Sequence, residues 1–422
     1  MTRNEKIELL APAGNPEKLA TAIHYGADAV YLSGKAYSLR NYAGNFTLEE
    51  MAKGIETARE AGVRVYVAVN AFPRPQEMED LAVYLKALAH LQPDALIIAD
   101  PGVIYLAGQT APGIPIHLST QANTTNQWSA RFWQSLGITR INAARELRLD
   151  EIKAISEAAG LEIEAFAHGA MCMAYSGRCL LSSFMTRRSS NQGQCAHPCR
   201  WRYAVVEEFR PGQYMPVAED ETGTYVFNAK DLCMIEHLPK MIDAGIHSLK
   251  IEGRLKGLNY LATAIKTYRA AIDAYYASPS AYAVLPEWLS ELAHVGPRRY
   301  STGFYLNDPD AVRSGDEIAP PVDTRRFVGK IGRVYDGAHI ELAVRNKIQI
   351  GDPIDILKTR GENSTNTIQA IRTLDGTGVD TAQAPTRVNI RLAKPDRLRP
   401  NELVRKIEEA PIYPEERRYG NL

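Results

Sequence analysis

Four of the five cysteines in the sequence are gathered in one segment, at Cys172, Cys179, Cys195 and Cys199. Thiolates are soft ligands that select zinc, Cu(I) or iron–sulfur clusters, and scattered core cysteines would not gather in this way. The spacing is C-x6-C-x15-C-x3-C, in which only the last pair suits a zinc knuckle. Irregular spacing suits a cubane cluster at least as well. We therefore predict a metal or cluster site rather than buried, unpaired cysteines, and the spacing leaves zinc and iron–sulfur both open.

A second group of residues that could take part in catalysis or binding lies at the end of the last predicted barrel strand. Lys250, Glu252 and Arg254 alternate along the chain, which places them on one side of a strand. If that side faces a barrel lumen, the charges would hold an anionic cofactor, because a guanidinium binds a carboxylate through two hydrogen bonds. We predict catalytic roles for these three residues and for His168, whose alternative is a structural histidine.

The cofactor-binding prediction comprises Arg254, Lys250, Arg145 and Gln121. Gln121 and Arg145 follow the fifth and sixth predicted strands. Simpler alternatives exist for neighbouring positions: Arg145 and Glu146 would form a surface ion pair if exposed. Asn70 and Asp100, which follow the third and fourth strands, would cap the next helices.

Short apolar runs alternate with helical patterns over the first part of the chain. The predicted strands are 8–11, 29–32, 63–69, 95–98, 116–118, 139–142, 161–167 and 247–251. The predicted helices are 16–24, 48–61, 76–91, 102–109, 125–136, 149–158 and 258–276. Thr47 with Glu50 forms a capping box at the start of the second helix. Eight strands with intervening helices predict a TIM-type (β/α)8 barrel over residues 1–277. The rival, an open doubly wound sheet, lacks a G-x-G-x-x-G loop after the first strand.

One connection is far longer than the others. Residues of about 168–245 separate the seventh strand from the eighth, and this Cys-rich insertion leaves the strand end where TIM-barrel active sites lie. Residues 278–325 are rich in Pro, Ser, Gly and Asp and are expected to be a connector. The short β-like runs 327–334, 339–344, 353–358, 365–373, 386–392 and 403–406 follow. They predict a small antiparallel β-barrel over residues 326–422.

The composition limits the kinds of partner and the cellular location that we expect for the protein. The 422 residues carry 49 basic and 49 acidic side chains, so a nucleic-acid partner must be held by a local basic patch. The odd number of cysteines argues against a disulfide framework. We expect no membrane span and a cytoplasmic location, because no signal peptide and no apolar run of sufficient length are present.

Several longer motifs carry a family resemblance. They are residues 8–14 (ELLAPAG), 117–121 (HLSTQ), 164–182 (EAFAHGAMCMAYSGRCLLS), 193–201 (GQCAHPCRW) and 248–254 (SLKIEGR). Together they resemble the collagenase-like peptidase family of unassigned catalytic type, family thirty-two, over nearly the whole chain.

That resemblance implies a function other than the peptidase activity for which the family is named. Its better-understood members are hydroxylation factors for tRNA, ribosomal RNA and ubiquinone, and they carry a [4Fe–4S] cluster. The most similar branch implies prephenate-dependent formation of 5-hydroxyuridine at the tRNA wobble position, with tRNA as partner and a paralogous partner subunit as an option. The cluster ligands of that branch match Cys172, Cys179, Cys195 and Cys199, and Cys233 is an alternative fourth ligand.

Two other classes of function stay open at this point. Proteolysis would need an activated nucleophile; Cys172 and His168 lie four residues apart, but no H-E-x-x-H or G-x-S-x-G motif is present. A non-catalytic RNA-binding protein with a structural zinc is the other.

Basic residues interleaved with aromatic ones in the insertion suit single-stranded RNA, although a solvated basic loop would show the same pattern. These residues are Arg178, Arg187, Arg188, Arg200, Arg202, Trp201 and Tyr203. The C-terminal segment adds Arg325, Arg326, Lys330, Arg333, Arg345 and Lys347, a candidate tRNA-gripping surface.

Overall fold

The computed structural model describes residues 6–39, 44–171, 175, 179–192, 194–196, 198, 218–220, 223–225, 230–296, 300–306 and 325–408. The chain forms two compact units. The first comprises Met1–Trp288 with Arg298–Ile318, and the second comprises Leu289–Pro297 with Ala319–Leu422. None of the described helices is long and apolar enough to cross a membrane.

The first unit is a closed parallel barrel, which confirms the predicted fold class. In the described residues its strands are β1 (Glu8–Pro12), β2 (Ala29–Leu32), β3 (Arg64–Val69), β4 (Ala95–Ile98), β5 (Ile116–Leu118), β6 (Ile138–Asn142), β7 (Glu162–Gly169) and β11 (Ser248–Ile251). Each pairs with the next, and β11 closes the ring by pairing with both β7 and β1. These strands are almost wholly buried, as expected for parallel strands covered by helices.

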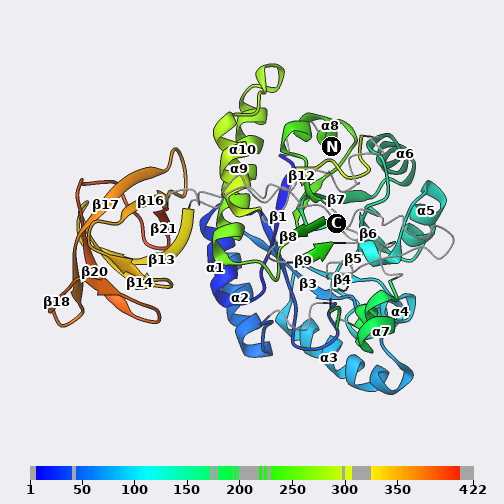
Figure 1. Cartoon of the computed structure of the whole chain (residues 1–422). Coiled ribbons are helices and arrows are strands. Elements are labelled where there is room, and N and C mark those ends of the chain that lie inside the picture. Colours follow the sequence, from blue (N-terminus) through cyan, green and yellow to red (C-terminus); the bar gives the residue numbers. More distant parts are fainter. Residues whose placement is uncertain are drawn as a thin grey trace, which may run out of the picture. The chain divides into compact units, whose positions relative to one another are not determined.

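Helices surround the strands (Figure 1). They are α1 (Pro16–His24), α2 (Leu48–Glu60), α3 (Met78–Leu91), α4 (Pro101–Thr110), α5 (Gln127–Ser135), α6 (Leu149–Ala159) and α9 (Leu258–Ala277). Side-chain caps fix the starts of α1, α2, α4 and α5. Thr47 and Glu50 form the predicted capping box of α2, and Asp100 accepts a hydrogen bond from the backbone of Val103 at the start of α4.

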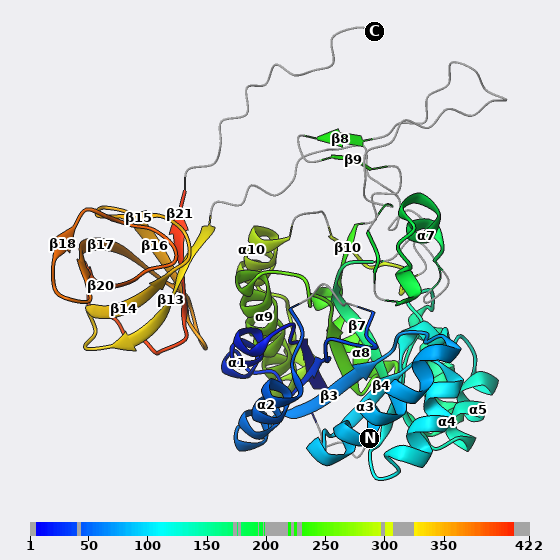
Figure 2. The same ribbon diagram turned by 90° about the horizontal axis from the view of Figure 1, so that it is seen from below.

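The insertion begins at the end of β7, and its described parts include several short elements. They include α7 (Leu181–Thr186), η3 (Ser190–Gln192), β8 (Ala218–Asp220), β9 (Gly223–Tyr225), β10 (Asp231–Cys233), η5 (Ile235–His237) and α8 (Leu238–Asp243). Strand β10 pairs antiparallel with the last residues of β7, so that Cys233 lies opposite His168. Figure 2 shows α7 and β10 together at one end of the barrel, the end where the strands terminate.

The range 278–325, expected to be a connector, contains regular structure. It holds η6 (Pro279–Ala281), α10 (Pro286–Val295) and β12 (Tyr300–Ser301), which pairs with β10. The composition of this range did not predict α10, because the helix is short and ion pairs contribute to its packing. Its Glu291 accepts hydrogen bonds from Arg405 and Arg325 within the second unit.

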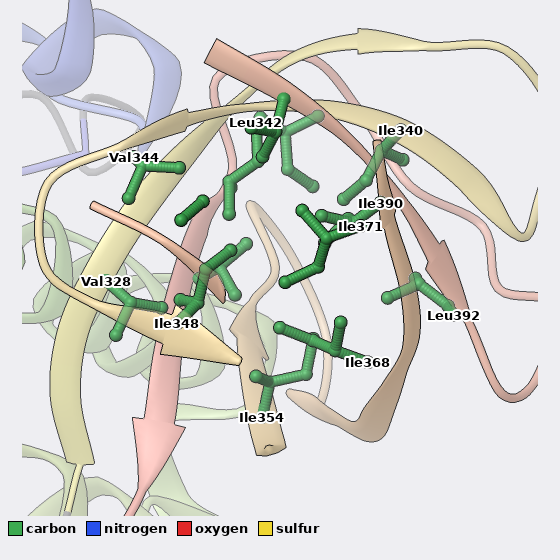
Figure 3. Close-up of a cluster of buried hydrophobic side chains, with 14 of the residues drawn as sticks. Val328, Ile340, Leu342, Val344, Ile348, Ile354, Ile368, Ile371, Ile390 and Leu392 are labelled. Carbon is green, nitrogen blue, oxygen red and sulfur yellow. The ribbon is translucent and has the colours of Figure 1, made fainter. Parts of the chain in front are cut away.

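The second unit closes into a small antiparallel β-barrel, as predicted. Its main strands are β13 (Arg325–Val334), β14 (His339–Val344), β16 (Pro353–Leu357), β17 (Ser364–Thr373), β20 (Arg387–Leu392) and β21 (Leu403–Ile407). Short strands β15 (Ile348–Gln349), β18 (Gly378–Val379) and β19 (Thr381–Ala382) complete it. The order β16-β21-β13-β14-β20-β17 closes through the pairing of β16 with β17. Its core is aliphatic, with side chains such as Val328, Ile340 and Ile390 gathered between the strands (Figure 3).

Candidate functional site

A pocket lies over the carboxyl ends of the barrel strands, where TIM-barrel active sites are found. It contains about 480 Å³ of empty space, part of it open to solvent, and its polar lining includes Asn70, Gln121, Arg145, Lys250, Glu252 and Arg254. The pocket therefore brings together three of the four residues predicted to be catalytic and all four predicted to bind a cofactor. Lys250 belongs to β11, whereas Glu252 and Arg254 follow its end.

Arg254 is held in a cradle of neutral oxygen atoms. Its guanidinium donates to the hydroxyl of Ser38 at 3.0 Å and also to Ser33 and Asn45. These contacts orient the guanidinium, which is 3% exposed. The backbone of Arg254 is fixed as well, since its carbonyl oxygen accepts from Lys18 Nζ at 2.9 Å. Sequence reasoning did not assign roles to Ser33, Ser38 and Asn45.

Gly14, in the ELLAPAG motif, allows this close approach. A Cβ atom added at Gly14 would lie 2.5 Å from the carbonyl oxygen of Arg254, closer than side chains tolerate. The glycine is therefore required by the backbone that presents Arg254 to the pocket.

Arg145 and Gln121 occupy other walls of the pocket. The Arg145 guanidinium lies 4.0 Å from the ring centre of Phe166, and the residue is 7% exposed. Arg145 is therefore buried, so the condition for a surface ion pair with Glu146 is not met. The Gln121 amide oxygen accepts from Asn70 Nδ2 at 3.3 Å and from the Ser119 hydroxyl. Asn70 thus lines the pocket and hydrogen-bonds to Gln121, rather than capping a helix.

Lys250 is buried and paired. Its Nζ lies 2.6 Å from Glu164 Oε1 on β7 and 4.4 Å from the ring centre of Tyr31. Burial lowers the pKa of Lys250, Glu164 opposes that shift, and Arg145 and Arg140 add to it, so that the net change is downward. The same Glu164 oxygen accepts from Asn142 Nδ2 at 2.9 Å.

Behind the pocket lies a buried ion pair that we did not predict from the sequence. Glu8 on β1 accepts from Arg140 on β6 at 2.6 Å and from the hydroxyl groups of Tyr66 and Ser248 at 2.7 Å each. Burial acts to raise the pKa of Glu8, but Arg140 and Arg64 lower it, and the net shift is downward. The signal available in the sequence was a carboxylate at the head of an otherwise apolar strand, which is costly unless it is paired.

His168 lies outside the pocket lining. It is fully buried beside the rings of Tyr260, Tyr268 and Tyr300, and its Nε2 is 3.5 Å from the Tyr300 hydroxyl. Burial, with the charge of Lys256, lowers the pKa of His168 to about 3, so the imidazole is neutral at physiological pH. Its catalytic role stays a prediction, and the arrangement fits a structural histidine.

Two of the predicted cluster ligands, Cys172 and Cys199, lie outside the described residues. Cys179 and Cys195 belong to one short, internally bonded segment, in which Ser190 donates to the Cys179 carbonyl and Ala196 donates to Ser182 Oγ at 3.0 Å. The described residues contain no group of three or more metal-binding side chains.

The cysteine segment is anchored beside the pocket. The backbone of Phe72, two residues beyond Asn70, donates to the Asn191 carbonyl at 3.1 Å. Thiolates are the donors that a [4Fe–4S] cluster takes, and two of the four predicted ligands belong to this segment.

Cys233 is less suited to bind a metal. It is held in β10, with its Sγ 3.8 Å from the Tyr268 hydroxyl. Burial raises the pKa of the Cys233 thiol to about 11, which disfavours the thiolate that a metal requires.

Two family models match the chain, one after the other along the sequence. The model of peptidase family U32 matches residues 14–314, and that of the peptidase family U32 C-terminal domain matches residues 323–405. The chain is 40% identical over 403 residues to tRNA hydroxylation protein P1 of Bacillus subtilis (strain 168), covering 95% of each. It is 39% identical over 397 residues to tRNA hydroxylation protein P of Escherichia coli (strain K12), covering 84% of this chain and 87% of that protein.

A third relative acts on a different RNA by its name. The chain is 33% identical over 365 residues to 23S rRNA 5-hydroxycytidine C2501 synthase of Escherichia coli (strain K12). That match covers 85% of this chain and 53% of the relative. The motifs, the barrel and these matches agree: the chain belongs to peptidase family U32, including that family's C-terminal domain.

Proposed function

We propose that this chain is an enzyme of tRNA hydroxylation that forms 5-hydroxyuridine at the wobble position. The observation that carries the proposal is the cationic pocket over the barrel strand ends, in a chain whose relatives of nearly equal length are named tRNA hydroxylation proteins. Arg145, Lys250 and Arg254 line that pocket, so it suits a small anion better than an apolar or a cationic ligand.

Prephenate is the proposed co-substrate. It carries two carboxylates, and Arg254 and Lys250 would pair with one or both of them, with Arg145 as the third cation. Gln121, whose amide oxygen is already engaged by Asn70 and Ser119, would present its amide nitrogen to the ligand. Glu252, on the same wall, would orient the polar part of the ligand.

We further propose that Cys172, Cys179, Cys195 and Cys199 hold a [4Fe–4S] cluster. Such a cluster would supply one-electron chemistry when bound. The serines of the segment, Ser182 and Ser190, would keep its backbone in place. Anaerobic purification should give about four irons and four sulfides per chain, lost in Cys179→Ala and kept in Cys233→Ala. One zinc without iron would instead support the structural-zinc alternative.

The tRNA itself would contact the insertion and the C-terminal barrel. In the insertion Arg187 is exposed, and Phe184 and Tyr175 are 87% and 64% exposed, which suits stacking with unpaired bases. Arg178, Arg200, Arg202, Trp201 and Tyr203 lie outside the described residues. In the second unit Arg326, Arg333, Arg345 and Lys347 are exposed. A paralogous partner subunit stays a prediction.

Three alternative functions are supported to different degrees. Ribosomal RNA is favoured as an alternative substrate by the relative named as a 23S rRNA 5-hydroxycytidine synthase, and ubiquinone stays a third option. The peptidase alternative relied on His168 as a base. A fully buried imidazole with its pKa lowered to about 3 is poorly suited to that role.

Nucleoside analysis tests the proposal. A strain lacking its own tRNA hydroxylation proteins is complemented with this chain, and 5-hydroxyuridine in tRNA and 5-hydroxycytidine in rRNA are measured by mass spectrometry. We expect the tRNA nucleoside to return with the wild type and not with Arg254→Ala. Return of the rRNA nucleoside alone would show that rRNA, not tRNA, is the substrate. Return of neither nucleoside would contradict the proposal.

A further inference from the structure

Lys250 is a buried residue of the pocket rather than a surface lysine. It is the third residue of the four-residue strand β11, its side chain reaches the pocket, and it is 4% exposed. A buried lysine that lines a pocket at the end of a barrel strand is in the setting where an amine can react with a carbonyl group.

Glu164 is placed to take part in the necessary proton transfers. Its Oε1 lies 2.6 Å from Lys250 Nζ, and the Glu164 side chain is 1% exposed. Its other oxygen, Oε2, makes no hydrogen bond among the described residues and is 3.7 Å from Arg140 Nη1. The net lowering of the Lys250 pKa, caused first by burial, makes the neutral amine easier to reach.

The groups around Lys250 define what kind of carbonyl compound would fit. Arg254 is fixed by Ser33, Ser38 and Asn45, and the Arg145 guanidinium lies over the Phe166 ring. Both guanidinium groups line the same pocket as the amine. A ligand with a carboxylate next to its carbonyl group would place the acid against a guanidinium while the carbonyl carbon meets Nζ.

We propose that Lys250 forms a covalent imine with a 2-oxo acid bound in this pocket. The ammonium form of Lys250 gives one proton to Glu164, and the free amine forms a C–N bond with the carbonyl carbon. The carbonyl oxygen leaves as water, taking the proton from Glu164 and a second proton from the attacking nitrogen. The product is a protonated imine plus water, and no electrons are gained or lost. Arg254 and Arg145 hold the carboxylate, and Glu164 re-forms its ion pair with the iminium.

This inference rests on the pocket of the proposed function but is tested without tRNA. The full-length protein is incubated with pyruvate as the probe, reduced with cyanoborohydride and analysed by intact mass and peptide mapping. We expect one reduced pyruvyl adduct per chain, located on the peptide that contains Lys250. Acetone, which has a carbonyl but no carboxylate, should give at least tenfold less adduct at equal concentration.

Two variants control the experiment. Lys250→Arg keeps a cation beside Glu164, so it should remain folded, and it should lose the adduct because a guanidinium is not nucleophilic at neutral pH. Lys256→Arg is the matched control. Lys256 is also a partly buried lysine near a carboxylate, 3.7 Å from Asp231, and it does not line the pocket. Its replacement should leave the adduct unchanged.

The outcomes separate this inference from the proposed function. No adduct on Lys250, or equal labelling of Lys250 and surface lysines, would overturn the imine and leave Lys250 as the charge partner of Glu164, whatever the tRNA assay shows. An adduct on Lys250 without any change in tRNA nucleosides would support the imine while the tRNA assignment fails.

Discussion

Among single substitutions in the barrel, those that break the buried ion pair between Arg140 and Glu8 should lower the free energy of unfolding most. Both side chains are 3% exposed, and Arg140 also contacts Glu162 at 2.7 Å and Glu164 at 3.7 Å. Arg140→Met removes the cation and leaves Glu8 in the lumen, where Arg64, half-exposed, is the remaining ionic contact among the described residues. Breaking a buried pair in this way costs about 3–5 kcal/mol of unfolding free energy.

The matched control is Arg148→Met. Arg148 has a similar contact, 3.0 Å from Asp150, but its side chain is 39% exposed, so its loss should lower the unfolding free energy far less than the loss of Arg140. Urea unfolding followed by tryptophan fluorescence is a suitable assay, because all four tryptophans belong to the barrel unit.

A double variant sharpens the comparison. Adding Glu8→Gln to Arg140→Met removes the stranded charge and should recover part of the lost stability, so that the two changes are not additive. Equal costs for Arg140→Met and Arg148→Met, or full additivity with Glu8→Gln, would refute the view that the lumen pair is buried and coupled.

Three further predictions concern the pocket and its surroundings. Gly14→Ala should displace the Arg254 carbonyl, lower the free energy of unfolding by about 1–3 kcal/mol and abolish tRNA hydroxylation in the complementation assay. The control Gly108→Ala, with open space around the glycine, should leave stability unchanged or raise it. An active Gly14→Ala protein would contradict the packing argument. Arg254→Lys keeps the charge but not the planar fork, so we expect at least tenfold weaker use of the co-substrate in a titration, and unchanged use would show that shape does not matter. Because the pKa of His168 falls from 6.5 to about 3 on folding, the unfolded state binds an extra proton between these values, and stability should drop as pH falls through that window, by up to about 1.4 kcal/mol per pH unit. His168→Gln should reduce that slope relative to the exposed His339→Gln, as measured by urea unfolding at several pH values; an unchanged slope would contradict the buried, neutral state.

The barrel could be predicted because its strands and helices are encoded locally. The apolar run 95–98 follows Asp94 and is followed, after Ala99, by Asp100, and it forms β4 with the predicted bounds. The helix 16–24 has its cap at Asn15 and likewise forms as predicted. Periodicity and capping act over a few residues, so they can be read without the tertiary structure.

The pocket could be predicted only in part, because its geometry depends on contacts between distant residues. The alternation of Lys250, Glu252 and Arg254 indicated a shared side, although only Lys250 lies within β11. The Arg254 cradle joins it to Ser33 and Ser38, more than two hundred residues away in the chain. No local pattern encodes such a pairing. The same reason explains why the pairing of Glu8 with Arg140 was not predicted.

The most direct test of the central claim is reconstitution with purified components. The anaerobically purified chain is incubated with tRNA that lacks the modification, with or without prephenate. Because replacing C5–H by C5–OH adds one oxygen atom and removes two electrons, parallel reactions contain O2 with a one-electron donor, or water as the oxygen source with a one-electron acceptor. The 5-hydroxyuridine formed is measured by mass spectrometry. The proposed function predicts that the nucleoside forms only with prephenate and with the intact cysteine site, and that it is absent with Arg254→Ala and Cys179→Ala. Formation of the nucleoside by both variants at the wild-type level would contradict the assignment of the pocket and the cysteines to this reaction.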